Sequence, residues 1–472
     1  MMVLLRKPTV LMVAVLLSGC ASFQPKPIVP KDTATAFDSR TLDNSGFKDF
    51  VRQNRKDTTT WPLTSWDASL LTLAAFYYHP DLDVARAQWG VAQAGVVSAG
   101  SVPNPGLTLS TQPSNTISIA SALPFGWNLD IPIETAGKRG YRIEQSKQLS
   151  ESARYHLYSA AWQIRSHLKT ALIELYSTQE SLLLLKEQKT VQSETVELLN
   201  RRLEIGAISR PEATQARIAL AQNDLAILDA QKRYDTALAK LAAAIGVPIN
   251  SLKGMKLSFE ELTDLPKPEM LPSEEARRQA LLSRSDLLSA LADYEASQTA
   301  LQLEVAKQYP DIHLGPGYIW DQGGRQWSVG LTFPLPVFNQ NTGPIAEASA
   351  RREQAAANFT ALQARSINEA KLAWTNYQSA ASQLDKANSL LQAQQQQQRS
   401  ITAEFNVGES DRLTLASSQL ELVNAKLARL DAQVKGMLAL GSLEDTTQHP
   451  LTQKELAPNL VETSPRKEEK HQ

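Results

Sequence analysis

The sequence predicts an α+β membrane protein with an internal duplication, in which each half combines strands with a very long helical hairpin. Three observations predict this fold class: a long repeat, two stretches of alternating strands, and helical segments too long for a compact globule. Residues 79–246 and 284–441 carry the repeat, and the run Leu-Asp-Ala-Gln at 228–231 recurs unchanged at 430–433. Such a unit cannot bury its apolar faces alone, so the copies must stack on neighbours.

The chain begins with a targeting segment, residues 1–19, which has two basic residues followed by the short apolar run Val10–Leu17. The run Leu-Ser-Gly-Cys that ends at Cys20 resembles the bacterial lipobox, so we expect cleavage before Cys20 and a thioether-linked lipid on its thiol. Cys20 is the only cysteine, so no intramolecular disulfide can form. The residue after Cys20 is alanine rather than aspartate, which in bacterial lipoproteins favours a location at the outer membrane.

The charge balance excludes one class of partner. The formal net charge is −1, from 48 basic and 49 acidic residues, so the chain lacks the basic footprint of a nucleic-acid-binding protein. We expect the following organisation: signal peptide 1–19, lipidated segment 20–65, first repeat 66–246, linker 247–272, second repeat 273–443, and disordered tail 444–472.

The predicted strands lie at about 105–133 and 310–336, where apolar and polar residues alternate. In Ile117–Ile133 the odd positions are mostly apolar and the even positions small or polar. A soluble sheet also alternates, but strands of about ten residues with tryptophan at their ends are typical of strands that face lipid. These tryptophans are Trp127, Trp320 and Trp327.

The number of strands predicts oligomerisation. Two strands in each repeat give four per chain, whereas a closed barrel needs about eight. Open sheet edges are not tolerated in lipid, because their backbone groups would have no hydrogen-bonding partners. We therefore expect several chains to share one barrel.

The predicted helical hairpins span 140–246 and 343–441. Between Gly140 and Leu203 there is no proline or glycine, and the same holds for 345–405. At about 1.5 Å per residue, each stretch makes a helix of roughly 90 Å. The returning helix of the second hairpin has two apolar rows at heptad spacing, typical of a coiled coil. These rows are Leu413, Leu420, Leu427 and Val434, and Ala416, Val423, Leu430 and Met437.

The hairpin turns contain equivalent glycines, Gly206 and Gly408. Glycine favours the left-handed position just after a helix, so we expect each to end the first arm of its hairpin. Ser209 and Ser410 follow, and serine favours the N-cap of a returning helix.

These features together resemble the TolC-like outer membrane efflux protein family, from about Trp61 to Leu443. The motifs that carry the resemblance are the lipobox at Cys20, the segment His79-Pro80-Asp81-Leu82, the duplication, and the passage from Asp130 to Gly140. That last passage, Asp-Ile-Pro-Ile-Glu-Thr-Ala-Gly-Lys-Arg-Gly, is similar to the branch that serves metal-exporting tripartite pumps.

The resemblance implies a homotrimer with a 12-stranded outer membrane β-barrel, continued by a long α-helical barrel in the periplasm of a Gram-negative bacterium. It also implies partners: a periplasmic adaptor protein, an inner-membrane efflux transporter and outer membrane lipid. The implied adaptor contacts at the hairpin tips are Gly206, Ile208, Ser209, Gly408, Glu409 and Ser410.

The resemblance further implies an acidic entrance gate at Glu409 and Asp411. The family pattern has another acidic residue near Thr414 or Leu415, and it is missing here. A second interpretation is compatible with the first: Glu409 and Asp411 favour a helix N-terminus because their charge complements the helix dipole.

The sequence carries no motif of an enzyme or a metal site. His156 and His167 are eleven residues apart, roughly 16 Å along one helix, so they cannot share a metal within one chain. We expect His79 to be a helix-end residue and His313 a strand residue. We therefore predict no catalytic residues, no metal ligands and no cofactor apart from the lipid on Cys20.

The predicted function is a passive exit duct, an outer membrane channel that conducts substrate from the periplasm to the exterior. The alternative is a structural or adaptor-type periplasmic coiled-coil lipoprotein, but an adaptor has one hairpin where this chain has two. The sequence leaves the exported substrate open between metal cations and drugs.

Overall fold

The computed structural model describes residues 23–55, 61, 63, 65–111, 125–321 and 324–451. The expected signal peptide, the expected lipidation site Cys20 and residues 452–472 of the expected tail lie outside this part of the chain, as does segment 112–124 of the expected first strand pair. Met1–Thr41 form a separate unit, in which the described residues contain helix α2 (Pro30–Asp38). The second unit, Leu42–Gln472, holds the other described helices and strands.

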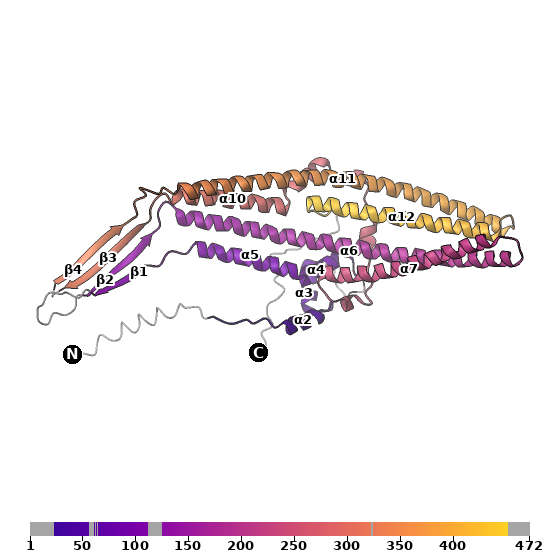
Figure 1. Cartoon of the computed structure of the whole chain (residues 1–472), viewed down its shortest axis with the longest axis horizontal. Coiled ribbons are helices and arrows are strands. Elements are labelled where there is room, and N and C mark those ends of the chain that lie inside the picture. Colours follow the sequence, from indigo (N-terminus) through magenta and orange to yellow (C-terminus); the bar gives the residue numbers. More distant parts are fainter. Residues whose placement is uncertain are drawn as a thin grey trace. The chain divides into compact units, whose positions relative to one another are not determined.

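The second unit contains the same order of elements twice: helix, two strands, very long helix, turn, long helix (Figure 1). The first copy comprises α5 (Pro80–Ala99), β1 (Gly106–Thr111), β2 (Phe125–Ile133), α6 (Lys138–Glu204) and α7 (Arg210–Ile245). The second comprises α10 (Ser285–Ala306), β3 (Ile312–Asp321), β4 (Gly324–Thr332), α11 (Thr342–Asn406) and α12 (Arg412–Thr447). With 67 residues, α6 is a rod of roughly 100 Å.

Shorter elements precede and separate the copies. They are α3 (Ser45–Asn54), α4 (Ala68–Tyr78), the 3₁₀ helices η1 (Ile249–Leu252) and η2 (Pro268–Met270), α8 (Glu260–Thr263) and α9 (Glu274–Leu282). The backbone of Trp66, ahead of α4, pairs with Leu257 in an isolated parallel bridge, which joins the start of the unit to the connection between the copies.

The four strands form one antiparallel sheet in the order β1-β2-β3-β4, as the sequence predicts for each chain. Because β2 pairs with β3, strands from both copies share the sheet, with Trp127 opposite Tyr318. The outer strands are β1 and β4, and neither has a further strand partner among the described residues. The sheet thus has two open edges.

The register sorts the side chains onto two chemically different faces. One face is apolar and aromatic, and its tryptophan rings Trp127 and Trp327 lie with their centroids 6.1 Å apart. The other face carries mainly small and polar residues, together with Pro132 and Ile319: Thr108, Ser110, Gly126, Asn128, Asp130, His313, Gly315, Gly317, Ser328, Gly330 and Thr332. The expected period of two therefore holds over most of the sheet, with Ile319 on the polar face and Arg325 on the apolar face as exceptions.

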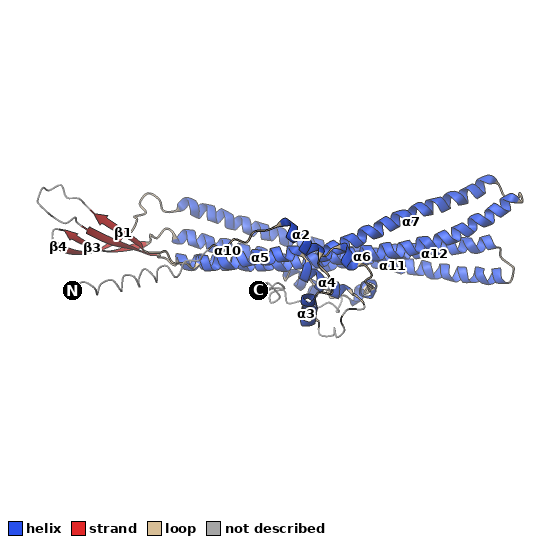
Figure 2. Ribbon diagram, turned by 90° about the horizontal axis from the view of Figure 1, so that it is seen from below, coloured by secondary structure: helices blue, strands red, loops and turns tan. Residues whose placement is uncertain are grey.

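Helix α6 is the central helix of the unit. Near the strands it packs against α5 and α10, and towards its other end it packs against α7 and α12 (Figure 2). Helix α11 packs along α10 and then α12. In α12, the heptad row of Ala416, Val423, Leu430 and Met437 is buried. The other predicted row is half-buried.

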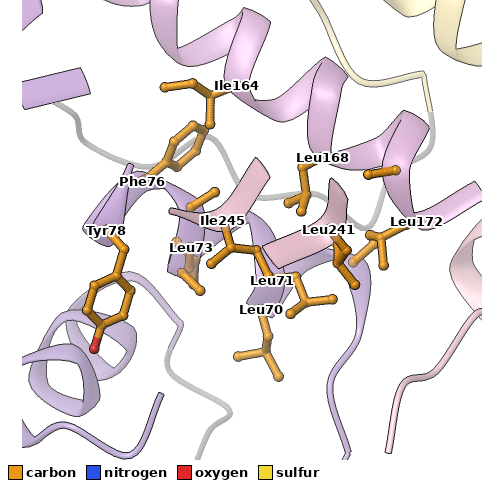
Figure 3. Packing of buried hydrophobic residues seen from close by; sticks show 14 of the residues in the cluster. Leu70, Leu71, Leu73, Phe76, Tyr78, Ile164, Leu168, Leu172, Leu241 and Ile245 are labelled. Carbon is orange, nitrogen blue, oxygen red and sulfur yellow. The ribbon is translucent and has the colours of Figure 1, made fainter. Parts of the chain in front are cut away.

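The main hydrophobic core lies about halfway along the helices, where α4 packs against α6 and α7 (Figure 3). Helix α4 is apolar on nearly every side, and Leu71 has no exposed surface. Leu168 of α6 and Leu241 of α7 pack against α4, and they too have no exposed surface. Each such leucine contributes about 1.5–3 kcal/mol relative to an exposed one. Among the described residues, no helix is both long and apolar enough to cross a membrane.

The end of α12 differs from the sequence expectation. We expected the tail to begin at residue 444, but α12 continues to Thr447. Glu444 is completely buried, and its Oε2 lies 3.0 Å from the Arg165 guanidinium and 2.6 Å from Lys169 Nζ, both on α6. Burial raises the pKa of Glu444, but the two cations outweigh that effect and lower it overall. This tertiary ion cluster extends the helix beyond the local sequence pattern.

Candidate functional site at the hairpin turns

The two hairpin turns are built alike. Helix α6 ends before Gly206, which has φ +73°, and α11 ends before Gly408, which has φ +84°. After each glycine the next amide reaches back to the helix: Ala207 N–H donates to Arg202 O at 2.8 Å, and Glu409 N–H to Glu404 O at 2.9 Å. The expected role of both glycines is confirmed by these left-handed conformations.

The two returning helices begin differently. Ser209 is the N-cap of α7, but its side chain makes no capping hydrogen bond. At α12 the expected N-cap Ser410 is wrong, because Asp411 holds that position and accepts hydrogen bonds from Thr414 N–H and Thr414 Oγ1, both at 2.8 Å. A carboxylate is favoured there, since it satisfies free amides and complements the positive end of the helix dipole.

Asp411 also joins the two hairpins. Its Oδ2 accepts a hydrogen bond from the Arg202 guanidinium at 2.8 Å, and Arg202 belongs to the last turn of α6. The hydrogen bond from Arg202, followed by those from Thr414, lowers the pKa of Asp411 to about 2. Asp411 therefore serves as a helix cap and as an inter-hairpin contact, and Glu409 is exposed beside it.

Further polar contacts continue along α6 and α12 away from the turns. Arg412 pairs with Glu194 of α6, and its guanidinium lies 5.5 Å from the Phe405 ring centroid. Lys426 Nζ lies 2.7 Å from Glu187 Oε1. Because these pairs are partly exposed, each contributes little to stability alone, but together they set the register of one hairpin against the other.

Each turn also exposes an apolar side chain that is not among the expected adaptor contacts. Ile205 is 79% exposed and Val407 is 72% exposed. They occupy equivalent places, each directly before the left-handed glycine. Ile208, an expected adaptor contact, is half-buried. The equivalence of Ile205 and Val407 in the two repeats is the signal that could have identified them.

The motif between Asp130 and Gly140 forms the junction between sheet and helices. Thr135 N–H donates to Asp311 Oδ1 at 2.9 Å, and Lys138 Nζ donates to the same oxygen at 2.7 Å and to Tyr309 O at 2.6 Å. Arg142 pairs with Glu134. The motif of the first repeat therefore holds the beginning of β3 in the second repeat.

The histidines are dispersed among different contacts. His79 is the N-cap of α5, with Nδ1 accepting from Asp81 N–H at 3.3 Å, and His156 Nε2 lies 3.1 Å from Ser289 Oγ. His313 lies on β3, as expected, with Nδ1 2.9 Å from Asp130 Oδ1. Within the described part of the chain, no three His, Cys, Asp or Glu residues cluster as metal ligands.

A family model for outer membrane efflux proteins matches residues 75–247 and 276–444, more than half of the chain. The chain belongs to the outer membrane efflux protein family. The two matched ranges follow the duplication, and the resemblance found in the sequence is confirmed.

Two relatives in this family span most of the chain. The cobalt-zinc-cadmium resistance protein CzcC of Cupriavidus metallidurans is 24% identical over 354 residues, which cover 74% of this chain and 82% of that protein. The probable efflux pump outer membrane protein TtgC of Pseudomonas putida is 22% identical over 387 residues, covering 76% of this chain and 78% of that protein.

Solved structures share the fold. The outer membrane protein VceC of Vibrio cholerae has a TM-score of 0.65 at 19% identity, covering 82% of this chain and 97% of that one. CusC has a TM-score of 0.64 at 17% identity, covering 83% and 94%. The fold of this chain is therefore similar to that of these solved proteins.

Proposed function

We propose that this outer membrane efflux protein is the exit duct of a tripartite pump, conducting substrate passively from the periplasm to the exterior. The observation that carries the proposal is the combination of two features: a sheet with one mainly apolar and one mainly small and polar face, and two helical hairpins that continue from it. The apolar face suits lipid, and the polar face suits a water-filled lumen.

The duct is a homotrimer in this proposal. Strands β1 and β4 leave both edges of the sheet open within one chain, and unpaired edges are costly in lipid. Three copies supply twelve strands, enough to close a barrel. The long helices of each copy then continue the barrel into the periplasm as a tunnel.

The hairpin turns are the proposed contact for a periplasmic adaptor. The exposed side chains of Ile205 and Val407 give each turn an apolar tip, and Gly206, Ile208, Ser209, Gly408, Glu409 and Ser410 surround them. The adaptor links the duct to an inner-membrane transporter, which supplies the energy.

The entrance gate is proposed at Glu409 and Asp411. The contact between Arg202 and Asp411 holds α12 against α6 in the resting arrangement. Docking of the adaptor separates the hairpins, and this contact breaks as the entrance opens. Asp411 then faces the passing solute as a free carboxylate.

The proposed cargo is a metal cation, because one relative is named for cobalt, zinc and cadmium resistance. Another relative is named an antibiotic efflux pump protein, so drugs are the second candidate. A lipid on Cys20, added after removal of residues 1–19, would hold each chain at the outer membrane.

The first test is the native mass of the detergent-extracted protein, measured by light scattering with the detergent subtracted. A mass near three chains, followed by discrete conductance steps in a planar bilayer, is expected. A monomer that gives no conductance would overturn the duct and favour a structural or adaptor-type lipoprotein. Survival of a deletion strain on metals and on antibiotics would then separate the two cargo classes.

A further inference from the structure

The polar face of the sheet is nearly free of ionisable groups. Among its described strand residues, Asp130, His313 and Asp321 are the ionisable ones, and Asp321 lies apart at the end of β3. Asp130 and His313 come from different repeats and meet because β2 pairs with β3. The sheet thus brings one imidazole and one carboxylate together on a face whose other described strand side chains, apart from Asp321, are uncharged.

The two side chains lie in contact and remain accessible. His313 Nδ1 is 2.9 Å from Asp130 Oδ1, and the side chains are 39% and 53% exposed. Gly106 lies directly opposite Asp130 on β1 and has no side chain to cover it. Gly315 on β3 has no side chain either, and the Asn128 side chain lies 3.6 Å from the place that its Cβ would take. A hydrated ion in front of this face can therefore reach both groups.

We propose that Asp130 and His313 form a contact site for divalent transition-metal cations such as Zn²⁺ on the lumen side of the sheet. This site rests on the proposed function for its place in the lumen and deepens it by naming the cargo class. Imidazole nitrogen and carboxylate oxygen together suit zinc and its first-row neighbours.

The geometry accommodates the cation with a small movement. Zinc binds each of these atoms at about 2.1 Å, so a tetrahedral site needs Nδ1 and Oδ1 roughly 3.4 Å apart. Starting from 2.9 Å, two side chains this exposed can open by that amount. The Nδ1–H that donates to Asp130 in this contact must lose its proton to solvent, with Nε2 keeping or taking up a proton, before the Nδ1 lone pair can bind the cation.

Two protein ligands make a weak site, which is what conduction requires. Water completes the coordination, so the ion is held loosely enough to leave again. In a threefold-symmetric assembly the pair occurs three times at one level of the lumen. The ring thereby raises the local concentration of cations without trapping them.

Single-channel recording with Zn²⁺ tests the site. In the wild type, Zn²⁺ is expected to reduce conductance reversibly, whereas Mg²⁺ at the same concentration has little effect because it gives up its water reluctantly. Asp130→Asn and His313→Gln each remove one ligand and keep a polar side chain of similar size. Each should raise the half-blocking Zn²⁺ concentration by roughly tenfold or more.

The matched control is His167→Gln on α6, whose side chain is exposed and distant in the fold from the strands. It should leave the Zn²⁺ response unchanged. An equal response in wild type and His313→Gln would overturn the site while leaving the duct in place.

A second readout does not depend on conductance. Diethyl pyrocarbonate modifies accessible histidines, and mass spectrometry locates them. Zn²⁺ should protect His313 and not His167 in the detergent-extracted protein. Protection without any conductance would support the site and overturn the duct, and equal modification of His313 with and without Zn²⁺ would overturn the site.

Discussion

Gly246 and Gln448 end the equivalent helices α7 and α12 with the same left-handed backbone conformation, and each lies against the beginning of another helix. Gly246 has φ +86° and meets the Tyr78–His79 backbone ahead of α5. Gln448 has φ +48°, and its Oε1 accepts from Ser285 N–H at 2.8 Å at the start of α10. In both repeats, one helix therefore begins where another ends. The helices α5 and α7, and likewise α10 and α12, thus follow one another and together pack along most of the length of α6.

The close approach at Gly246 predicts a large effect of one methyl group. A Cβ there would lie 2.8 Å from Tyr78 O and 2.9 Å from His79 Cα, both backbone atoms that cannot rotate away. Gly246→Ala should destabilise by about 1–2 kcal/mol for the left-handed conformation, and by roughly 1–3 kcal/mol more for the overpacking. Thermal unfolding followed by circular dichroism measures the sum.

Gly206→Ala is the control for this comparison. Gly206 also has a positive φ at a helix end, but nothing lies within 4 Å of its missing Cβ. It should show only the conformational cost, of about 1–2 kcal/mol. Equal losses in the two variants would mean that the contact with Tyr78 and His79 is not tight in solution.

The buried carboxylate of Glu444 predicts a second strong effect. Glu444→Gln keeps the shape but removes the buried negative charge that pairs with Arg165 and Lys169. Breaking a buried pair on one side costs about 3–5 kcal/mol. The matched control on the same helix is Asp431→Asn, which breaks an exposed pair with Lys435 and should change the unfolding free energy by less than about 1 kcal/mol. Similar melting temperatures for both variants would contradict the buried cluster.

The sequence predicted those parts of the fold that depend on local patterns. Alternation along β2, as at Leu129 and Ile131, is a property of neighbouring residues, and the register confirms it. The left-handed glycines Gly206 and Gly408 follow from the same local logic. The end of α12 could not be predicted, because Glu444 becomes favourable only when α6 brings two cations to it.

The contacts of the candidate site are harder to predict from the sequence than the local elements of the fold. Asp411 was identified, but its partner Arg202 is 209 residues away and is selected by helix packing, not by any motif. Ser410 and Asp411 are both good N-caps, so local propensity could not decide between neighbours. His313 was expected on a strand, and only the pairing of β2 with β3 shows that it faces Asp130.

The contact between Arg202 and Asp411 predicts how the resting entrance behaves. Asp411→Arg should raise resting conductance roughly two- to fivefold, which is the scale of one partly exposed ion pair. The combined variant Arg202→Asp with Asp411→Arg restores opposite charges and should return conductance toward the wild-type value. Arg201→Ala is the control, because Arg201 pairs within α6, with Glu197. No change in Asp411→Arg would remove Asp411 from the gate.

The low pKa of Asp411 makes the same contact resistant to acid. Its pKa falls from an ordinary value of 3.8 to about 2 in the folded chain, so the stabilisation is fully present above 3.8 and is lost as the pH falls through about 2. Resting conductance held by this contact should therefore stay constant from neutral pH to about pH 5. It should rise only as the pH approaches the lowered pKa. Asp411→Asn cannot lose a charge, so its conductance should lack that acid-induced rise. A wild-type rise between neutral pH and about pH 5 would mean that a group titrating at higher pH than Asp411 holds the entrance closed.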